Sequence, residues 1–280
     1  MLTALFEQFL KEKHYLKGIS PLTTRSYRQA FDRFTKSGAT EISKASLNQF
    51  VVYMREQELA TTSCNISIRS INAFCTWLYE NEHIPENLKL KQVKEEKRVL
   101  TGYTDEEIKK ILSLKPEDLY DWRLYSLACL LIDTGIRIEE ALTIHRKDVD
   151  LDNLLIKVRG KRNKERVVPI SLELRKVLLK LLNKHPHDIV FATRSGQRLS
   201  YRNILREWEI LCHKLEIPYR PFHQLRHNFA LSFIREGGDV FTLRRLLGHS
   251  SIQTTSIYVN LQTEDLKRAH AKTSILGRLK

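Results

Sequence analysis

Apolar residues recur at every third or fourth position along most of the chain, and this spacing predicts a protein built mainly from helices. The first part of the sequence contains four such amphipathic segments, separated by short polar stretches. The second segment begins at Ser20 and Pro21, and the third is capped by Ser46. The fourth spans about 61–81. Four helices with short loops pack as a bundle, which we expect over residues 1–88.

A charged stretch separates this bundle from the rest of the chain. Residues 89–99 are weakly periodic and come soon after Pro85. The pattern favours a solvated linker between two domains, with a structured element as the alternative. Thr104 and Glu107 then have the spacing of a capping box, whose side chains satisfy the unpaired amides at a helix N-terminus. We therefore expect a second domain over residues 100–280.

The second domain combines helices with one predicted hairpin. An apolar helix over 122–132 ends near Gly135, which breaks the helical pattern. Alternating β-branched residues over 154–159 and 166–170 enclose a basic tip, which predicts an antiparallel β-hairpin. Further helices are expected after Ser171, over 200–213, over 222–236, and from Asp239 to a stop at Gly248. The predicted fold class is mainly α (α+β): an N-terminal helical bundle and a larger, mostly helical domain that holds a small antiparallel β-sheet.

Composition limits the class of partner and the compartment. The 280 residues include 47 lysines and arginines against 33 acidic residues, a formal net charge of +14. A field of this sign attracts nucleic acid, although a basic protein without such a partner is the alternative. The four cysteines are far apart, which disfavours a metal finger or disulfide scaffold. No apolar run approaches the roughly 18 residues of a membrane span, and the N-terminus has the pattern of an amphipathic helix, so we expect a cytoplasmic protein.

Two segments place arginines where a solvated role is unusual. Arg137 directly follows the glycine break after the apolar helix, and an ion pair with a neighbouring glutamate is its alternative role. On the helix predicted over 222–236, spacings of three and four put His223, Arg226 and His227 on one face. Zinc binding is disfavoured, because the zinc-protease helix needs a glutamate where this chain has Gln224. His227 precedes an apolar stretch, which is typical of a histidine in the core.

Three further residues complete a set that fits phosphodiester chemistry. Lys161 lies near the basic hairpin tip, His249 follows the helix stop, and Tyr258 comes nine positions later. Their ordinary roles would be a solvated lysine, a satisfied histidine and a core tyrosine. Cleavage of a phosphodiester without a metal needs cations at the non-bridging oxygens, a nucleophile and a proton donor. A tyrosine nucleophile also needs cationic neighbours, because its ordinary pKa is near 10.

Taken in order, these motifs resemble the tyrosine recombinase (phage integrase) family in its short, Xer-like form. The matching motifs are TGIRIEE over 134–140, GKRNKER over 160–166, HQLRH over 223–227 and LLGHSSIQTTSIYV over 246–259. The resemblance is close over 100–260. The N-terminal part resembles the core-binding domain of the family more loosely. The resemblance implies a core-binding domain over 1–88 and a catalytic domain over 100–280.

The resemblance implies a role for each member of the catalytic set. Arg137 and Arg226 would clamp the scissile phosphate. His249 would add a hydrogen bond, and His223 would act as a base or a positioning group. The other two members would change bonds rather than hold the phosphate.

In the same family pattern, Lys161 would protonate the 5′ oxygen, and Tyr258 would form a 3′-phosphotyrosine link. The covalent link conserves the energy of the phosphodiester, so no cofactor, ATP or metal is implied. Family members act as tetramers on two DNA sites, which implies a homotetramer here, with or without a second recombinase or accessory protein. Residues 265–280 would form a tail helix that docks on a neighbour.

The implied function is site-specific exchange of strands between two short core sites, in the resolution or integration of a replicon or mobile element. The first predicted helix begins almost at Met1, so we expect no separate arm-binding domain. Two rivals share part of this pattern: a relaxase of the type IB topoisomerase kind, and a DNA-binding regulator without catalysis. A metal-dependent nuclease is disfavoured, because no carboxylate cluster accompanies the histidines.

Overall fold

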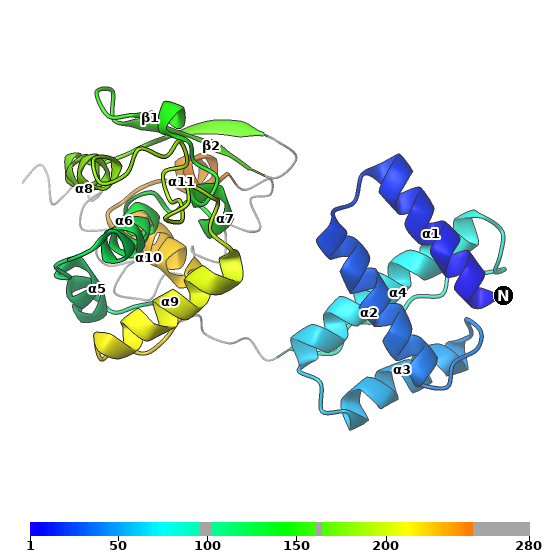
Figure 1. Ribbon diagram of the computed structural model, residues 1–280. Coiled ribbons are helices and arrows are strands. Elements are labelled where there is room, and N and C mark those ends of the chain that lie inside the picture. Colours follow the sequence, from blue (N-terminus) through cyan, green and yellow to red (C-terminus); the bar gives the residue numbers. More distant parts are fainter. Residues whose placement is uncertain (96–101, 161–163, 249–280) are drawn as a thin grey trace, which may run out of the picture. The chain divides into compact units, whose positions relative to one another are not determined.

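The computed structural model describes residues 1–95, 102–160 and 164–248 (Figure 1). The chain divides into two compact units, Met1–Val99 and Leu100–Lys280. Helices dominate both units, and the strands found in the described part all lie in the second, where they form one sheet. The predicted fold class is therefore confirmed. None of the helices over the described ranges combines the length and the apolar character that a membrane-spanning helix requires.

The first unit contains the four predicted helices, and its core lies along the fourth. Ser20 caps the second helix as predicted, with Pro21 in its first turn. The third helix is capped by Ser43, and the prediction of Ser46 is wrong. Ser46 is the third residue of that helix, where its hydroxyl accepts from the Ser43 amide and completes a capping box. The helices are α1 (Leu2–Lys17), α2 (Pro21–Lys36), α3 (Lys44–Glu56) and α4 (Thr61–Glu80).

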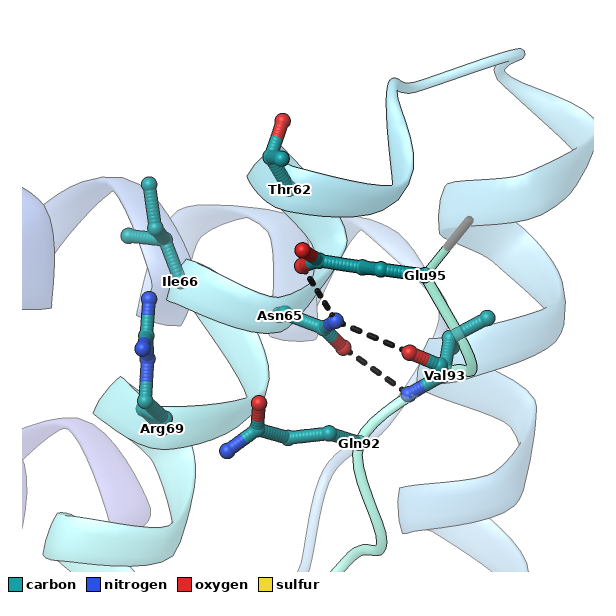
Figure 2. A pocket seen from close by; sticks show the side chains of 7 residues that line it. All are labelled: Thr62, Asn65, Ile66, Arg69, Gln92, Val93 and Glu95. Atoms are coloured by element: carbon teal, nitrogen blue, oxygen red, sulfur yellow. Dashed lines mark hydrogen bonds between the residues drawn. The ribbon is translucent and has the colours of Figure 1, made fainter. Parts of the chain in front are cut away.

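The first part of the expected linker is held on this bundle rather than solvated. Asn65 and Asn72 of α4 lie seven residues apart and bond to the chain that follows the helix, and Figure 2 shows the bonds of Asn65. The Asn72 amide accepts from the Leu90 N–H and donates to the Leu90 carbonyl, both at 2.9 Å. Asn65 pairs in the same way with Val93, at 2.8 and 2.9 Å. The side chains of Leu88, Leu90 and Val93 also pack against the core.

The prediction of a solvated linker is therefore wrong over residues 89–93, and the reason is physical. Each asparagine directs one side-chain N–H and its side-chain carbonyl to the backbone C=O and N–H of a single residue, so it imitates the pairing of a neighbouring β-strand. The apolar residues are too widely spaced among charges for their burial to be read from periodicity. Residues 96–99 of the predicted linker lie outside the described residues.

We predict that each asparagine protects its own partner amide from hydrogen exchange. Asn72→Ala removes the acceptor of the Leu90 N–H, so exchange at Leu90 should accelerate about tenfold while Val93 changes less. Asn65→Ala should give the reverse pattern. The measurement is residue-resolved exchange by nuclear magnetic resonance. Unchanged protection at both amides in both variants would contradict this docking of the chain.

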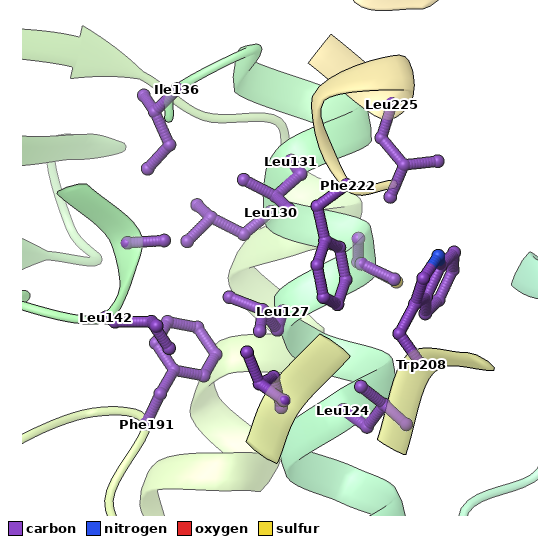
Figure 3. Close-up of a cluster of buried hydrophobic side chains, with 14 of the residues drawn as sticks. Leu124, Leu127, Leu130, Leu131, Ile136, Leu142, Phe191, Trp208, Phe222 and Leu225 are labelled. Atoms are coloured by element: carbon purple, nitrogen blue, oxygen red, sulfur yellow. The ribbon is translucent and has the colours of Figure 1, made fainter. Parts of the chain in front are cut away.

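The second unit is organised around one apolar helix, α6 (Leu119–Thr134), which is buried on several sides (Figure 3). Leu124, Leu127 and Leu131 of this helix meet Trp208 and Phe222 in a single core. The remaining helices are α5 (Asp105–Leu112), α7 (Ile138–Ala141), α8 (Leu172–Leu182), α9 (Tyr201–Lys214), α10 (His223–Arg235) and α11 (Val240–Leu247), with a 3₁₀ turn η1 (Arg146–Asp148). The predicted capping box of Thr104 and Glu107 opens α5.

The predicted hairpin is present at one edge of this core. Strands β1 (Val149–Asp150), β2 (Leu155–Arg159) and β3 (Glu165–Pro169) form an antiparallel sheet in the order β1-β2-β3. Val158 pairs with Arg166, which fixes the register of the hairpin. Ile156, Val158 and Val168 face the core, while alternate residues face outward.

Two glycines end the helices that border the site. Gly135 ends α6 with φ 62°, and Gly248 ends α11 with φ 65°, both in the left-handed region. A side chain at Gly135 would also clash with Phe229, because an added Cβ would lie 2.3 Å from that ring. Both predicted helix stops are confirmed. They fix where the chain leaves α6 toward Arg137 and where it leaves α11.

Candidate active site

A buried carboxylate, that of Glu140, lies at the centre of the candidate site. Its side chain is only 4% exposed. As the third residue of the short helix α7, it accepts the backbone N–H of Arg137 at 2.9 Å. The Arg137 guanidinium donates to the same carboxylate at 2.9 Å. Arg166 of β3 adds two parallel bonds, at 3.0 and 2.8 Å. Two arginines from distant parts of the sequence therefore meet at one acid.

These partners keep Glu140 ionised. Burial would by itself raise the pKa of Glu140, but the hydrogen bonds from Arg166 and from the backbone and side chain of Arg137 outweigh burial and lower that pKa. A bidentate pair of arginine and carboxylate is among the stronger contacts in proteins. The site thus pairs the negative charge of Glu140 with the positive charges of Arg137 and Arg166.

Arg137 is attached to this centre yet remains accessible. Its side chain is 42% exposed, and Glu140 is the one side-chain partner found for its guanidinium among the described residues. The sequence left two roles open, an ion pair with a neighbouring glutamate or a phosphate ligand. The structure shows the ion pair, and it leaves 42% of the side chain exposed. The two roles are therefore compatible.

Arg226 is buried and joins two helix ends. It lies on α10 and donates to the Gly135 carbonyl at 2.8 Å and to the Leu247 carbonyl at 3.0 Å. Both carbonyls belong to helix C-termini, where partial negative charge favours a cation. Gly135 is two residues before Arg137, so Arg226 links the Arg137 turn to the end of α11.

The two histidines of HQLRH differ in exposure although they belong to the same helix. His223 is the first residue of α10 and is exposed, and its Nε2 lies 3.2 Å from the side-chain nitrogen of Gln224. His227, one turn later, is buried, as predicted for a core histidine. Within the described ranges no three histidine, cysteine, aspartate or glutamate residues are grouped as metal ligands.

The other three predicted residues, Lys161, His249 and Tyr258, lie outside the described residues. The residues that precede the first two are described, and both border the Glu140 centre. An added Cβ on Gly160 would lie 3.2 Å from the Glu140 carboxylate, and one on Gly248 would lie 2.8 Å from the Arg166 guanidinium. The structure thus brings together Arg137, Arg226 and the last described residues before Lys161 and His249.

Arg166 is the residue of this site that the sequence did not single out. It is one of several basic residues near the hairpin tip, and all carry the same charge. Strand alternation was a usable signal, because Arg166 lies two residues before Val168 and so shares its inward face. An ion pair of Arg137 with a neighbouring glutamate was an expected alternative, and Glu140 is that glutamate, but its pairing with Arg166 depends on contact across 26 residues.

We predict that Glu140→Gln destabilises the second unit by about 3 kcal/mol at neutral pH, because it leaves Arg166 without its counter-charge. The folded-state pKa of Glu140 lies below the ordinary value of 4.5. Its contribution is therefore present above pH 4.5 and lost as the pH falls through the folded pKa. The variant should show a shallower loss of stability on acidification.

Thermal unfolding at neutral and acid pH measures both effects. Glu139→Gln is the matched control, since Glu139 is exposed on the same helix turn. Equal unfolding temperatures for Glu140→Gln and Glu139→Gln would rule out the central role of the buried carboxylate.

Comparison with known proteins places this geometry in context. The sequence pattern of the phage integrase family matches residues 103–265. The tyrosine recombinase XerA of Thermococcus kodakarensis is 31% identical over 281 residues, which cover 98% of this chain and 95% of that protein. Among solved structures, a XerA recombinase is 25% identical with a TM-score of 0.54, covering 98% of this chain and 99% of that one.

A second solved structure supports the fold. The Tn1549 transposon integrase in complex with transposon right end DNA superposes with a TM-score of 0.80, covering 96% of this chain and 98% of that one. Its sequence identity is 17%, so the likeness concerns the fold alone.

Proposed function

This chain belongs to the phage integrase family and is a tyrosine site-specific recombinase, and from that premise we propose that it cleaves and rejoins DNA through a 3′-phosphotyrosine intermediate. One observation carries the proposal. Arg137 and Arg226 are joined through the Gly135 turn, beside the residues that lead into Lys161 and His249. Four separate segments therefore meet, which supports the binding of a phosphate at this point.

The arginines act on the scissile phosphate. Attack on phosphorus increases the negative charge on the two non-bridging oxygens, and donors held in place beforehand stabilise that charge. Arg137 presents its guanidinium at the surface while Glu140 fixes its other side. Arg226 completes the clamp from α10, and His249 adds a hydrogen bond. His223 stands at the N-terminus of the same helix, where it positions the attacking group or accepts its proton.

The remaining two residues change the bonds. The Tyr258 oxygen attacks phosphorus and gives up its proton, and the bond from phosphorus to the 5′ oxygen breaks. Lys161 donates a proton to that oxygen, which leaves as a 5′ hydroxyl. The 5′ hydroxyl of a partner strand then attacks the phosphotyrosine and restores the phosphodiester. Because one ester replaces another, no nucleotide hydrolysis is required.

The two units divide the work on DNA. Residues 1–88 act as the core-binding domain, residues 89–99 connect the units, and residues 100–280 catalyse. The formal charge of +14 supports binding to a polyanion, and the related transposon integrase is known in a complex with DNA. Strand exchange between two short sites requires four active tyrosines, so the working assembly is a homotetramer on two DNA sites. Its task is the resolution or integration of a replicon or mobile element.

We predict that Tyr258→Phe abolishes covalent adducts with nicked duplex DNA and leaves the dissociation constant within about twofold, because only the nucleophilic oxygen is lost. Detergent-stable adducts are measured on denaturing gels, and binding is measured by fluorescence anisotropy. Tyr219→Phe, at an exposed tyrosine of the same unit, should behave like the wild type. Adducts retained by Tyr258→Phe would exclude this nucleophile.

We predict that Lys161→Ala slows cleavage of ordinary DNA about 100-fold or more, because the leaving 5′ oxygen loses its proton donor. A 5′-phosphorothiolate has a leaving sulfur that needs no proton, so the same variant should cleave it at nearly the wild-type rate. Lys164→Ala serves as the control, since it removes the same charge from the same hairpin. Equal slowing on both substrates would remove Lys161 from the acid role.

A further inference from the structure

Arg166 joins three parts of the chain that are far apart in the sequence. From strand β3 its guanidinium makes the two bonds to Glu140 of α7 described above. Its Nε donates to the Leu246 carbonyl in the last turn of α11, at 3.1 Å. The side chain is 16% exposed, and no phosphate-binding or acid–base role has been assigned to it. Arg166 therefore contacts α7, which directly follows Arg137, and the end of α11, which precedes His249.

The geometry depends on the shape of an arginine side chain. Nη1 and Nη2 face both carboxylate oxygens of Glu140, while Nε points to a different helix. A lysine carries the same charge but cannot present this fixed fork. The Gly248 turn lies against the same guanidinium, since an added Cβ there would be 2.8 Å from Nη1. Arg166 and Arg226 thus bond to the successive carbonyls of Leu246 and Leu247.

We propose that Arg166 is a positioning residue, which keeps Arg137 available for phosphate and fixes the Gly248 turn relative to it. This inference rests on the proposed function. Among the described residues Glu140 has two cationic partners, and the bidentate contact belongs to Arg166. Without Arg166, the cationic partner that the described part of the chain still offers this carboxylate is Arg137. Arg137 is then drawn toward Glu140 and away from substrate, and the end of α11 loses its bond to Arg166.

Arg159 supplies a matched control on the neighbouring strand. It pairs bidentately with Asp148 at 3.2 and 3.0 Å and bonds to Glu165 through Nε at 3.1 Å. Its side chain is 31% exposed. Arg159→Gln therefore removes a similar set of bonds from the same hairpin without touching Glu140 or α11. A merely structural role for Arg166 predicts equal effects of the two substitutions once folded protein is compared.

The test compares Arg166→Gln, Arg166→Lys and Arg159→Gln with the wild type, at a temperature where circular dichroism shows each variant folded. Adduct formation on nicked duplex DNA should fall at least about tenfold in Arg166→Gln, with DNA affinity within about twofold. Arg166→Lys should recover part of the loss, because it restores charge but not the fork. Arg159→Gln should keep the wild-type rate. Equal rates for Arg166→Gln and Arg159→Gln would overturn the inference.

A second readout does not depend on chemistry. The Gly248 N–H donates to the Arg245 carbonyl, so its hydrogen exchange reports on the end of α11. Exchange at Gly248 should accelerate in Arg166→Gln and stay unchanged in Arg159→Gln. An unchanged rate in both would overturn the positioning role even if the wild type formed no adduct. Failure of the wild type to form adducts would instead contradict the proposed function.

Discussion

The ion pair between Glu140 and Arg166 is the contact on which the candidate site depends. Moving a carboxylate from water into the protein interior costs on the order of several kcal/mol of folding free energy unless cations and hydrogen bonds compensate for the lost hydration. For Glu140, this compensation comes from Arg166 of β3 and from the backbone N–H of Arg137 at the start of α7. Because the hairpin residue Arg166 and the Arg137 turn both stabilise this one charge, the carboxylate ties the position of the hairpin to that of Arg137.

Helix ends supply the second constraint. α6 is packed within the core of the second unit, and its C-terminal glycine directs the chain outward at a defined point. α11 ends in the same left-handed manner, and Arg226 bonds to carbonyls at both ends. An apolar scaffold thus sets the distance between two turns, while arginines at its edge set their orientation. Two residues of the proposed catalytic set, Arg137 and His249, follow soon after these turns in the sequence.

Periodicity and local rules predicted the helices, the hairpin, the Thr104 cap and the two glycine stops, because each depends on residues near in sequence. The same rules failed where the partner is distant. The docking of residues 88–93 depends on two asparagines of α4, and the role of Arg166 depends on Glu140 and Leu246. The family motifs predicted Arg137 and Arg226. The structure shows the contacts that fix them, with Glu140 for Arg137 and two helix-end carbonyls for Arg226. Arg137, Arg226 and His223 lie in the described part of the chain, whereas the nucleophile and the proton donor were predicted from motif alone.

The most direct test of the covalent account is to identify the residue that becomes attached to DNA. Wild-type protein is mixed with nicked, fragmented chromosomal DNA from the organism that encodes it, and detergent stops the reaction. The trapped DNA is sequenced, and the DNA-linked peptide is identified by mass spectrometry. The account predicts linkage through Tyr258 at a single short inverted repeat. Linkage through another residue, or adducts scattered without sequence preference, would contradict it.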